Sequence, residues 1–167
     1  MATLHCTQKV RRRLRLPEAL QGTTPPTNAL GDWTVNLIQF GRLQLVMATS
    51  ERSLLTVLVP ARELQKTLKP NLLVAVQTLL LALRLPAVAV NDEIASMLPI
   101  SYGRAGNRRV LGSMNDFAVQ AAAYLERTDD LLVLALQLSD TPMSAIGSNS
   151  GYGYPREVAC QLLTKAQ

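Results

Sequence analysis

The segment GNRRVLGSMNDFA, residues 106–118, gathers arginine, asparagine, serine and aspartate side chains around two glycines. Arginine holds carboxylate and phosphate groups, and an aspartate can handle a proton during a reaction. The residue types therefore predict an anion-holding pocket along Asn107–Asp116, in which arginine would hold an anionic group and Asp116 would transfer the proton. The predicted ligand-binding residues are Asn36, Arg52, Arg108, Ser113, Asn115 and Asp116.

The same segment has a purely structural interpretation. Ser113 is a good N-cap residue for a helix over 113–127, and Asp116 three positions later would complete a capping box. Just upstream, arginines at 104, 108 and 109 alternate with glycines at 103, 106 and 112, which suits either an anion site or a loop whose arginine pairs with Asp116. On the sequence alone both interpretations stay open.

A second group of residues that could bind a ligand is the run KVRRRLR, residues 9–15. It carries five cations and no acid, whereas the other twelve cations of the chain are balanced by its 12 acids, so the net charge of +5 is local. Such a run can attract nucleic acid, an anionic membrane surface or an acidic protein partner. The predicted nucleic-acid-binding residues are Lys9, Arg11, Arg12, Arg13 and Arg15. The alternative is a solvated helix face, because no aromatic residue is interleaved for base stacking.

Several kinds of chemistry are not expected. His5 is the one histidine, and Cys6 beside it would point to the opposite face of a strand, so the two cannot form a nucleophile and base pair. The spacing of cysteines and histidine offers no metal site, and neither a phosphate-binding loop nor a dinucleotide fingerprint is present, so neither metal nor cofactor is expected. A non-catalytic binding module is therefore favoured over an enzyme.

Composition and cysteine usage indicate the setting. With 167 residues, 48% of them hydrophobic, the chain is expected to form a single domain over 1–167. Its N-terminus lacks the apolar region of a secretory signal, and its two cysteines show no pairing pattern, so a cytoplasmic location is expected. The longest apolar run, residues 72–83, is too short for the ~20 residues that span a bilayer. This run is therefore expected to form a helix that is either buried in the core or in contact with a second copy of the chain in a homodimer.

The periodicity of apolar residues predicts an α+β fold with a small antiparallel sheet packed with helices. A three-stranded meander is predicted over 33–59, with a bulge where Ile38 and Phe40 switch face, and one or two further strands over 3–6 and 99–104. The absence of βαβ alternation favours α+β over a parallel sheet. Helices are predicted over 7–16, 61–68, 72–83, 90–97, 113–127, 130–138 and from Pro155.

Five blocks carry a resemblance to a known family: LHCTQKV, LGDWTVNLI, TSERSLLTVLVP, NRRVLGSMNDFA and TPMSAIG followed by YGYP. In this order they resemble a family of small bacterial proteins described only as a domain of unknown function. The blocks fall on His5, Cys6, Thr7, Trp33, Asn36, Arg52, Asn107, Arg108, Gly112, Ser113, Asn115 and Asp116. The chain departs from the pattern at Arg109, where a small polar residue is expected, and in a longer loop before Tyr154. The resemblance implies a single-domain bacterial protein, and it implies no activity or ligand.

Overall fold

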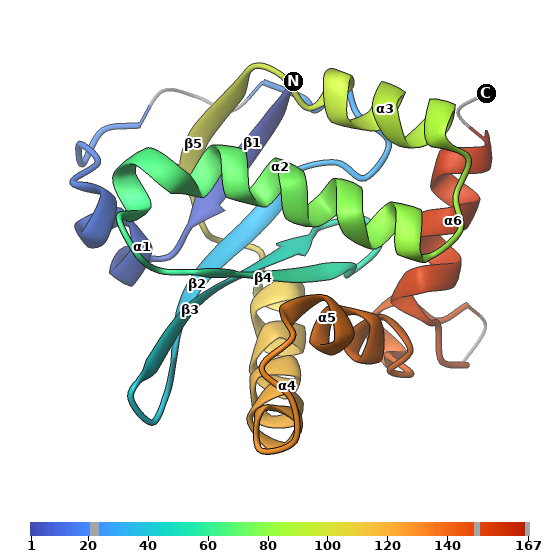
Figure 1. Ribbon diagram of the computed structural model, residues 1–167. Helices are drawn as coiled ribbons and strands as arrows, with labels where there is room; N and C mark the ends of the chain where they lie inside the picture. The colour runs from blue at the N-terminus through green and yellow to red at the C-terminus, as the bar shows by residue number, and fades with distance from the viewer. Residues whose placement is uncertain (21–23, 149–150, 166–167) are drawn as a thin grey trace.

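The computed structural model describes residues 1–20, 24–148 and 151–165 (Figure 1). Its strands are β1 (Ala2–Cys6), β2 (Trp33–Phe40), β3 (Leu43–Ser50), β4 (Thr56–Pro60) and β5 (Ile100–Arg104). Its helices are α1 (Gln8–Leu14), α2 (Leu64–Ala82), α3 (Ala87–Ser96), α4 (Arg108–Leu125), α5 (Leu131–Ser139) and α6 (Pro155–Lys165), with a short 3-10 turn at Ser144–Ile146. The predicted α+β class is confirmed.

The sheet is mixed, in the order β4-β3-β2-β1-β5. Strands β2, β3 and β4 form the predicted antiparallel meander, but β1 pairs in parallel with both β2 and β5. The prediction of a purely antiparallel sheet was wrong, because β1, α1 and β2 form a parallel crossover. The segment 7–32 between these strands exceeds the dozen or so residues that such a connection needs.

Strand β2 has no bulge where one was predicted. Its register with β3 runs without interruption from Trp33 opposite Ser50 to Phe40 opposite Leu43. Ile38 and Phe40 pack against the second core cluster, on the face opposite to Trp33 and its neighbours. The apparent change of face in the sequence therefore reflects a strand that is covered on both sides.

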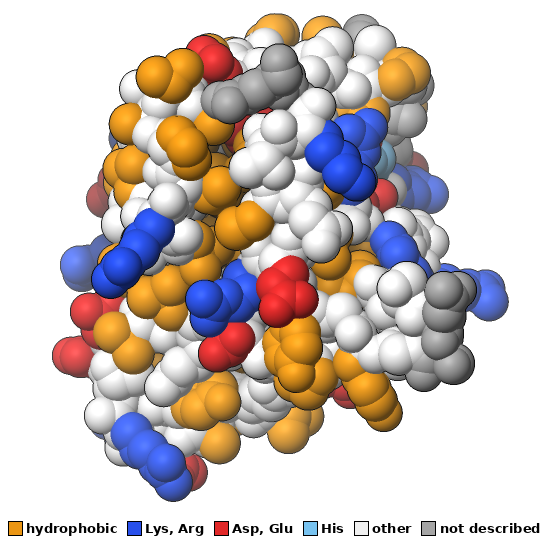
Figure 2. All heavy atoms as spheres, turned by 90° about the vertical axis from the view of Figure 1, so that its right-hand side faces the viewer, with side chains coloured by type: hydrophobic (Ala, Val, Ile, Leu, Met, Phe, Trp, Pro, Cys, Tyr) orange, Lys and Arg blue, Asp and Glu red, His pale blue; other side chains and the backbone are white. Residues whose placement is uncertain are grey.

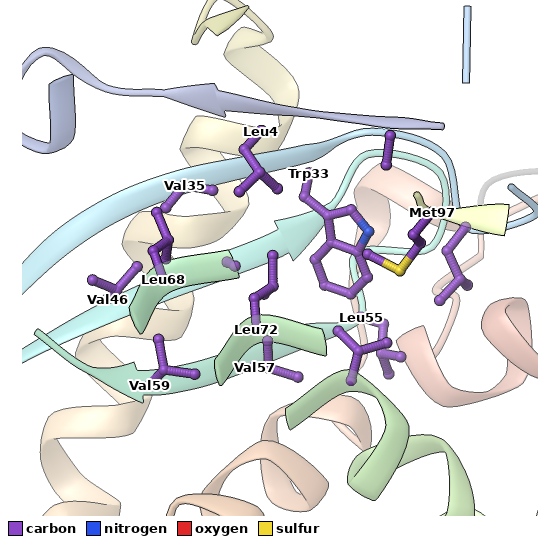
Figure 3. Packing of buried hydrophobic residues seen from close by; sticks show 14 of the residues in the cluster. Leu4, Trp33, Val35, Val46, Leu55, Val57, Val59, Leu68, Leu72 and Met97 are labelled. Atoms are coloured by element: carbon purple, nitrogen blue, oxygen red, sulfur yellow. The ribbon is translucent and has the colours of Figure 1, made fainter. Parts of the chain in front are cut away.

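Helices cover both faces of the sheet (Figure 1). On one face, α2 packs along the strands, and Figure 3 shows Leu68 and Leu72 of this helix beside Trp33 and the valines of β2, β3 and β4. On the other face, Met114 and Phe117 of α4 pack against Met47. Helices α2 and α5 both contact β4. Side chains of α5 belong to both hydrophobic core clusters, and residues on both faces of β4 are buried.

Helix α2 is continuous where two helices were predicted. Pro70 lies inside it, and a proline within a helix costs about 3 kcal/mol. Leu64, Leu68, Leu72 and Val76 are all buried at four-residue spacing, and each such side chain stabilises by about 1.5–3 kcal/mol. The free energy gained by burying this continuous apolar stripe therefore exceeds the cost of Pro70, and the helix continues through it.

Helix α4 begins one turn and a half before the predicted start at Ser113. Its N-cap is Asn107, whose side-chain oxygen accepts from the N–H of Val110 at 3.3 Å. Ser113 is buried within the helix and donates its hydroxyl to the carbonyl of Arg109 at 3.1 Å, so the predicted capping box with Asp116 was wrong. Burial of Val110 in line with Met114 and Phe117 extends the apolar stripe upstream.

Candidate functional site

The outward face of α1 carries most of the cations of the basic run. Val10 and Leu14 are buried against the sheet, which leaves Lys9, Arg12 and Arg13 exposed. Positions 9, 12 and 13 lie within about 100° of one another on a helix, so these three side chains share one surface. The chain then turns through Arg15, which adopts a left-handed conformation with φ 55° and is also exposed.

Arg11 differs from the other cations of the run. Its Nη2 atom donates to the carbonyl oxygens of Pro17 and Glu18, each at 3.1 Å. The guanidinium therefore ties the end of α1 to the chain that follows it. Of the five predicted nucleic-acid-binding residues, Arg11 has a structural role and the other four face solvent.

A pocket of about 520 Å³ lies between the end of α1 and the first turn of α2. We call it the basic pocket; it is lined by Arg12, Arg13, Arg15, Glu63, Leu64, Gln65 and Lys66. Four cations thus face one carboxylate. Lys66 lies 51 residues beyond Arg15 in the sequence, and no sequence motif points to it. A lysine on an exposed helical turn is common, and only the contact between α1 and α2 places it beside the basic run.

Among the described residues on the opposite side of the molecule, no comparable gathering of cations is seen. Figure 2 views the side where α3 and α6 lie, and there the lysine and arginine side chains form separate small groups among apolar and acidic ones. Arg156, at the start of α6, forms an ion pair with Asp140 at 3.2 Å. The positive charge that the sequence places in residues 9–15 therefore stays concentrated around α1.

The six residues predicted to share a ligand pocket do not form one. Asn36 accepts from the hydroxyl of Thr7 at 2.9 Å, and Arg52 donates to the carbonyls of Asn28 and Ala29. Ser113 is buried in α4 as described. The other three, Arg108, Asn115 and Asp116, are exposed on the outer side of α4.

A different polar cluster lies at the sheet. Its residues come from β1 and β2, from the positions just before β2 and just after β3, and from the start of α4. We call it the β1 polar cluster; it consists of His5, Asp32, Thr34, Glu51 and Asn107. His5 Nε2 is 3.3 Å from Asp32 Oδ2, and the other oxygen of Asp32 accepts from the N–H of Thr3 at 2.7 Å. Glu51 accepts from the Thr34 hydroxyl at 2.7 Å and from the Asn107 amide at 3.2 Å.

This cluster has the residue types of an acid–base site, but its contacts hold the fold together. The Asp32 carbonyl accepts from the N–H of Glu51, so the two acidic residues tie the segment before β2 to the segment after β3. The Nδ1 atom of His5 lies against the backbone of Gly103, which leaves little space for a substrate on that side of the ring. The sequence did not indicate Asp32 or Glu51, because neither sits in a catalytic motif.

Cys6 provides no nucleophile. Its thiol is fully buried in the core on the face opposite to His5, as the alternation along β1 predicted. Burial raises the pKa of the Cys6 thiol to about 12, and the nearby Arg11 offsets this only in part. Among residues 1–20, 24–148 and 151–165, no group of three or more histidine, cysteine and acidic side chains could hold a metal ion.

In the same described ranges, none of the helices combines the length and apolar character that a bilayer crossing requires. The predicted loop 147–154 includes residues 149 and 150, which lie outside the described residues. On either side of them, Met143 and Gly153 exchange two backbone hydrogen bonds, at 2.8 and 2.9 Å.

Comparison with known proteins identifies the family and nothing narrower. A search of curated proteins and a search of solved structures each found no match. A family model described as a domain of unknown function, DUF6933, matches residues 3–158. These residues include strands β2 to β5, all of β1 except Ala2, the basic pocket and the β1 polar cluster, so the chain belongs to the DUF6933 family.

Proposed function

We propose that the protein is a non-catalytic binding module that binds nucleic acid through the basic face of α1. The observation that carries this proposal is the convergence of Arg12, Arg13 and Arg15 of the basic run with Lys66 of α2 in one pocket. These cations come from two segments and face a single acid, Glu63. Phosphate oxygens are the groups that such a surface attracts most strongly.

The composition of the pocket indicates how the nucleic acid is recognised. Its lining includes no aromatic side chain on which a base could stack, and four of its seven residues are cations. Binding is therefore directed at the phosphate backbone and is largely independent of base sequence. Four phosphate contacts to a single strand would lower the affinity about 50-fold between 50 and 200 mM salt.

The test is a salt titration of binding to a fluorescent single-stranded oligonucleotide, followed by anisotropy. The variant with Arg12→Glu and Arg13→Glu should lose most of the binding and flatten the salt dependence. A control with Arg42→Glu and Arg127→Glu has the same change in net charge, but both residues are exposed and neither lines the basic pocket. If both variants bind alike, net charge rather than the basic pocket is responsible, and a flat response of the wild type to salt rules the proposal out.

As a second candidate, a small-ligand site along Asn107–Asp116 is supported by one observation. Arg108 and Asn115 are exposed and seven residues apart on α4, so they share a face on which an anion can be held. Asn36 and Arg52 are not part of this version, because their side chains are bonded elsewhere. A titration with inorganic phosphate, followed by amide chemical shifts, should perturb the first two turns of α4 in the wild type and not in Arg108→Ala; unchanged shifts in the wild type rule it out.

A further inference from the structure

The basic pocket holds more positive charge than the repeating phosphodiester of a nucleic acid strand requires. Arg12, Arg13, Arg15 and Lys66 carry four positive charges around the pocket, against the one negative charge of Glu63. An internal phosphodiester brings a single negative charge and two free oxygens. A phosphate monoester at neutral pH brings a charge of about −1.5 to −2 and three free oxygens, each of which accepts strong hydrogen bonds.

The shape of the basic pocket also suits a compact, highly charged group. Its volume of about 520 Å³ is within the range of ~300–1,000 Å³ typical of pockets for small ligands, so it has room for one terminal nucleotide. Three arginines on one wall offer planar pairs of N–H donors, and Lys66 lies on the other wall as a mobile point charge. Donors on two walls can reach different oxygens of one phosphate.

We infer that the basic pocket binds the terminal phosphate of a nucleic acid strand, with Lys66 as the residue that distinguishes a terminal monoester from an internal diester. This inference rests on the proposed function, because the rest of the strand is held by the outward face of α1. Lys9, exposed on that face and outside the basic pocket, contacts the backbone beyond the terminal nucleotide.

The experiment compares three single-stranded oligonucleotides of one sequence, carrying a 5′-phosphate, a 3′-phosphate or no terminal phosphate. Affinities are measured by competition against a labelled strand in a buffer without phosphate. One of the phosphorylated strands should bind roughly tenfold or more tightly than the strand without a terminal phosphate, as two or more added charge-assisted hydrogen bonds would produce. A nucleoside monophosphate is the fourth competitor.

Lys66→Gln should remove the preference for the phosphorylated strand, because it weakens binding of that strand more than binding of the unphosphorylated strand, which loses a single phosphate contact. Lys66 is exposed, so the substitution leaves the core intact. The matched control is Arg42→Gln, an exposed cation outside the basic pocket, which should keep the full preference.

The outcomes separate this inference from the proposed function. Equal binding of all three strands, with a steep salt dependence, overturns the inference and leaves nucleic-acid binding standing. Absence of binding to every strand overturns both. A nucleoside monophosphate that binds as tightly as the phosphorylated strand overturns the assignment to a strand end, because the ligand is then a small phosphorylated molecule.

Discussion

The imidazole of His5 lies directly against Gly103 of the neighbouring strand. A Cβ atom built on Gly103 would be 2.8 Å from His5 Nδ1 and 2.9 Å from the Thr3 methyl carbon. His5 and Gly103 are neighbours because β1 and β5 pair in parallel, in a register that places His5 opposite Gly103. The absence of a side chain at position 103 therefore leaves room for the His5 ring, whose Nε2 atom is 3.3 Å from Asp32 Oδ2.

Gly103→Ala should destabilise the protein by about 1–3 kcal/mol, because the added methyl must displace the ring or the strand. The free energy of unfolding is measured by urea denaturation. Gly106→Ala is the matched control, since nothing lies within 4 Å of the position its Cβ would take, and it should change the stability by less than about 0.5 kcal/mol. Equal stability of Gly103→Ala and wild type would contradict the packing described for His5.

Asn107→Ala should cost about 1–2 kcal/mol, because it removes both the N-cap of α4 and the hydrogen bond to Glu51. Asn115→Ala, on the exposed side of the same helix, should have an effect of less than about 0.5 kcal/mol. Thermal and urea unfolding of the two variants would compare these positions directly. A larger loss at Asn115 than at Asn107 would show that α4 does not begin where the structure places it.

Gly112→Ala should stabilise the protein by about 0.5–1 kcal/mol. Gly112 lies inside α4 and is exposed, and nothing lies within 4 Å of the position its Cβ would take. Alanine loses less backbone entropy than glycine on entering a helix, so the gain arises mainly from the unfolded state. A lower melting temperature for this variant would mean that the helix surface at Gly112 is covered by another part of the protein or by a partner.

Glu93→Ala should destabilise by at least ~3 kcal/mol. The buried carboxylate of Glu93 accepts from the backbone N–H groups of Ala29 and Leu30 and from the Asn28 amide, at 2.8–3.0 Å. Its removal leaves buried donors without partners, at a cost of about 1–3 kcal/mol each. Asp92→Ala, at the exposed neighbouring position, is the control and should be near neutral in the same unfolding assay.

The two cysteines should react with thiol reagents in a fixed order. With a pKa of about 12, the Cys6 thiol is ionised in only about one molecule in 10⁴ at pH 8, and it is also fully buried. Burial raises the pKa of Cys160 as well, but this residue is only partly buried. Labelling with iodoacetamide at pH 8, followed by mass spectrometry, should modify Cys160 first and Cys6 only on unfolding; the reverse order would contradict the burial of β1.

Features that depend on short stretches of chain could be predicted from the amino-acid sequence. Alternating apolar residues predicted the β2–β4 meander, the helical period predicted most helices, and the run of cations at residues 9–15 predicted one basic surface. The sequence also excluded a Cys6–His5 pair, because neighbouring residues on a strand point to opposite faces. These properties follow from local periodicity and charge, which need no knowledge of distant contacts.

The contacts between residues far apart in the sequence depend on how the whole chain packs. The parallel pairing of β1 with β2 and β5 is set by burial of β1 in the sheet, and no local pattern specifies it. The same packing brings Lys66 beside α1, joins Glu51 to Asn107, and separates Asn36 from the exposed side of α4. Helix boundaries changed for the same reason, because the apolar stripes through Pro70 in α2 and upstream of Ser113 in α4 are stabilised by contacts with the sheet.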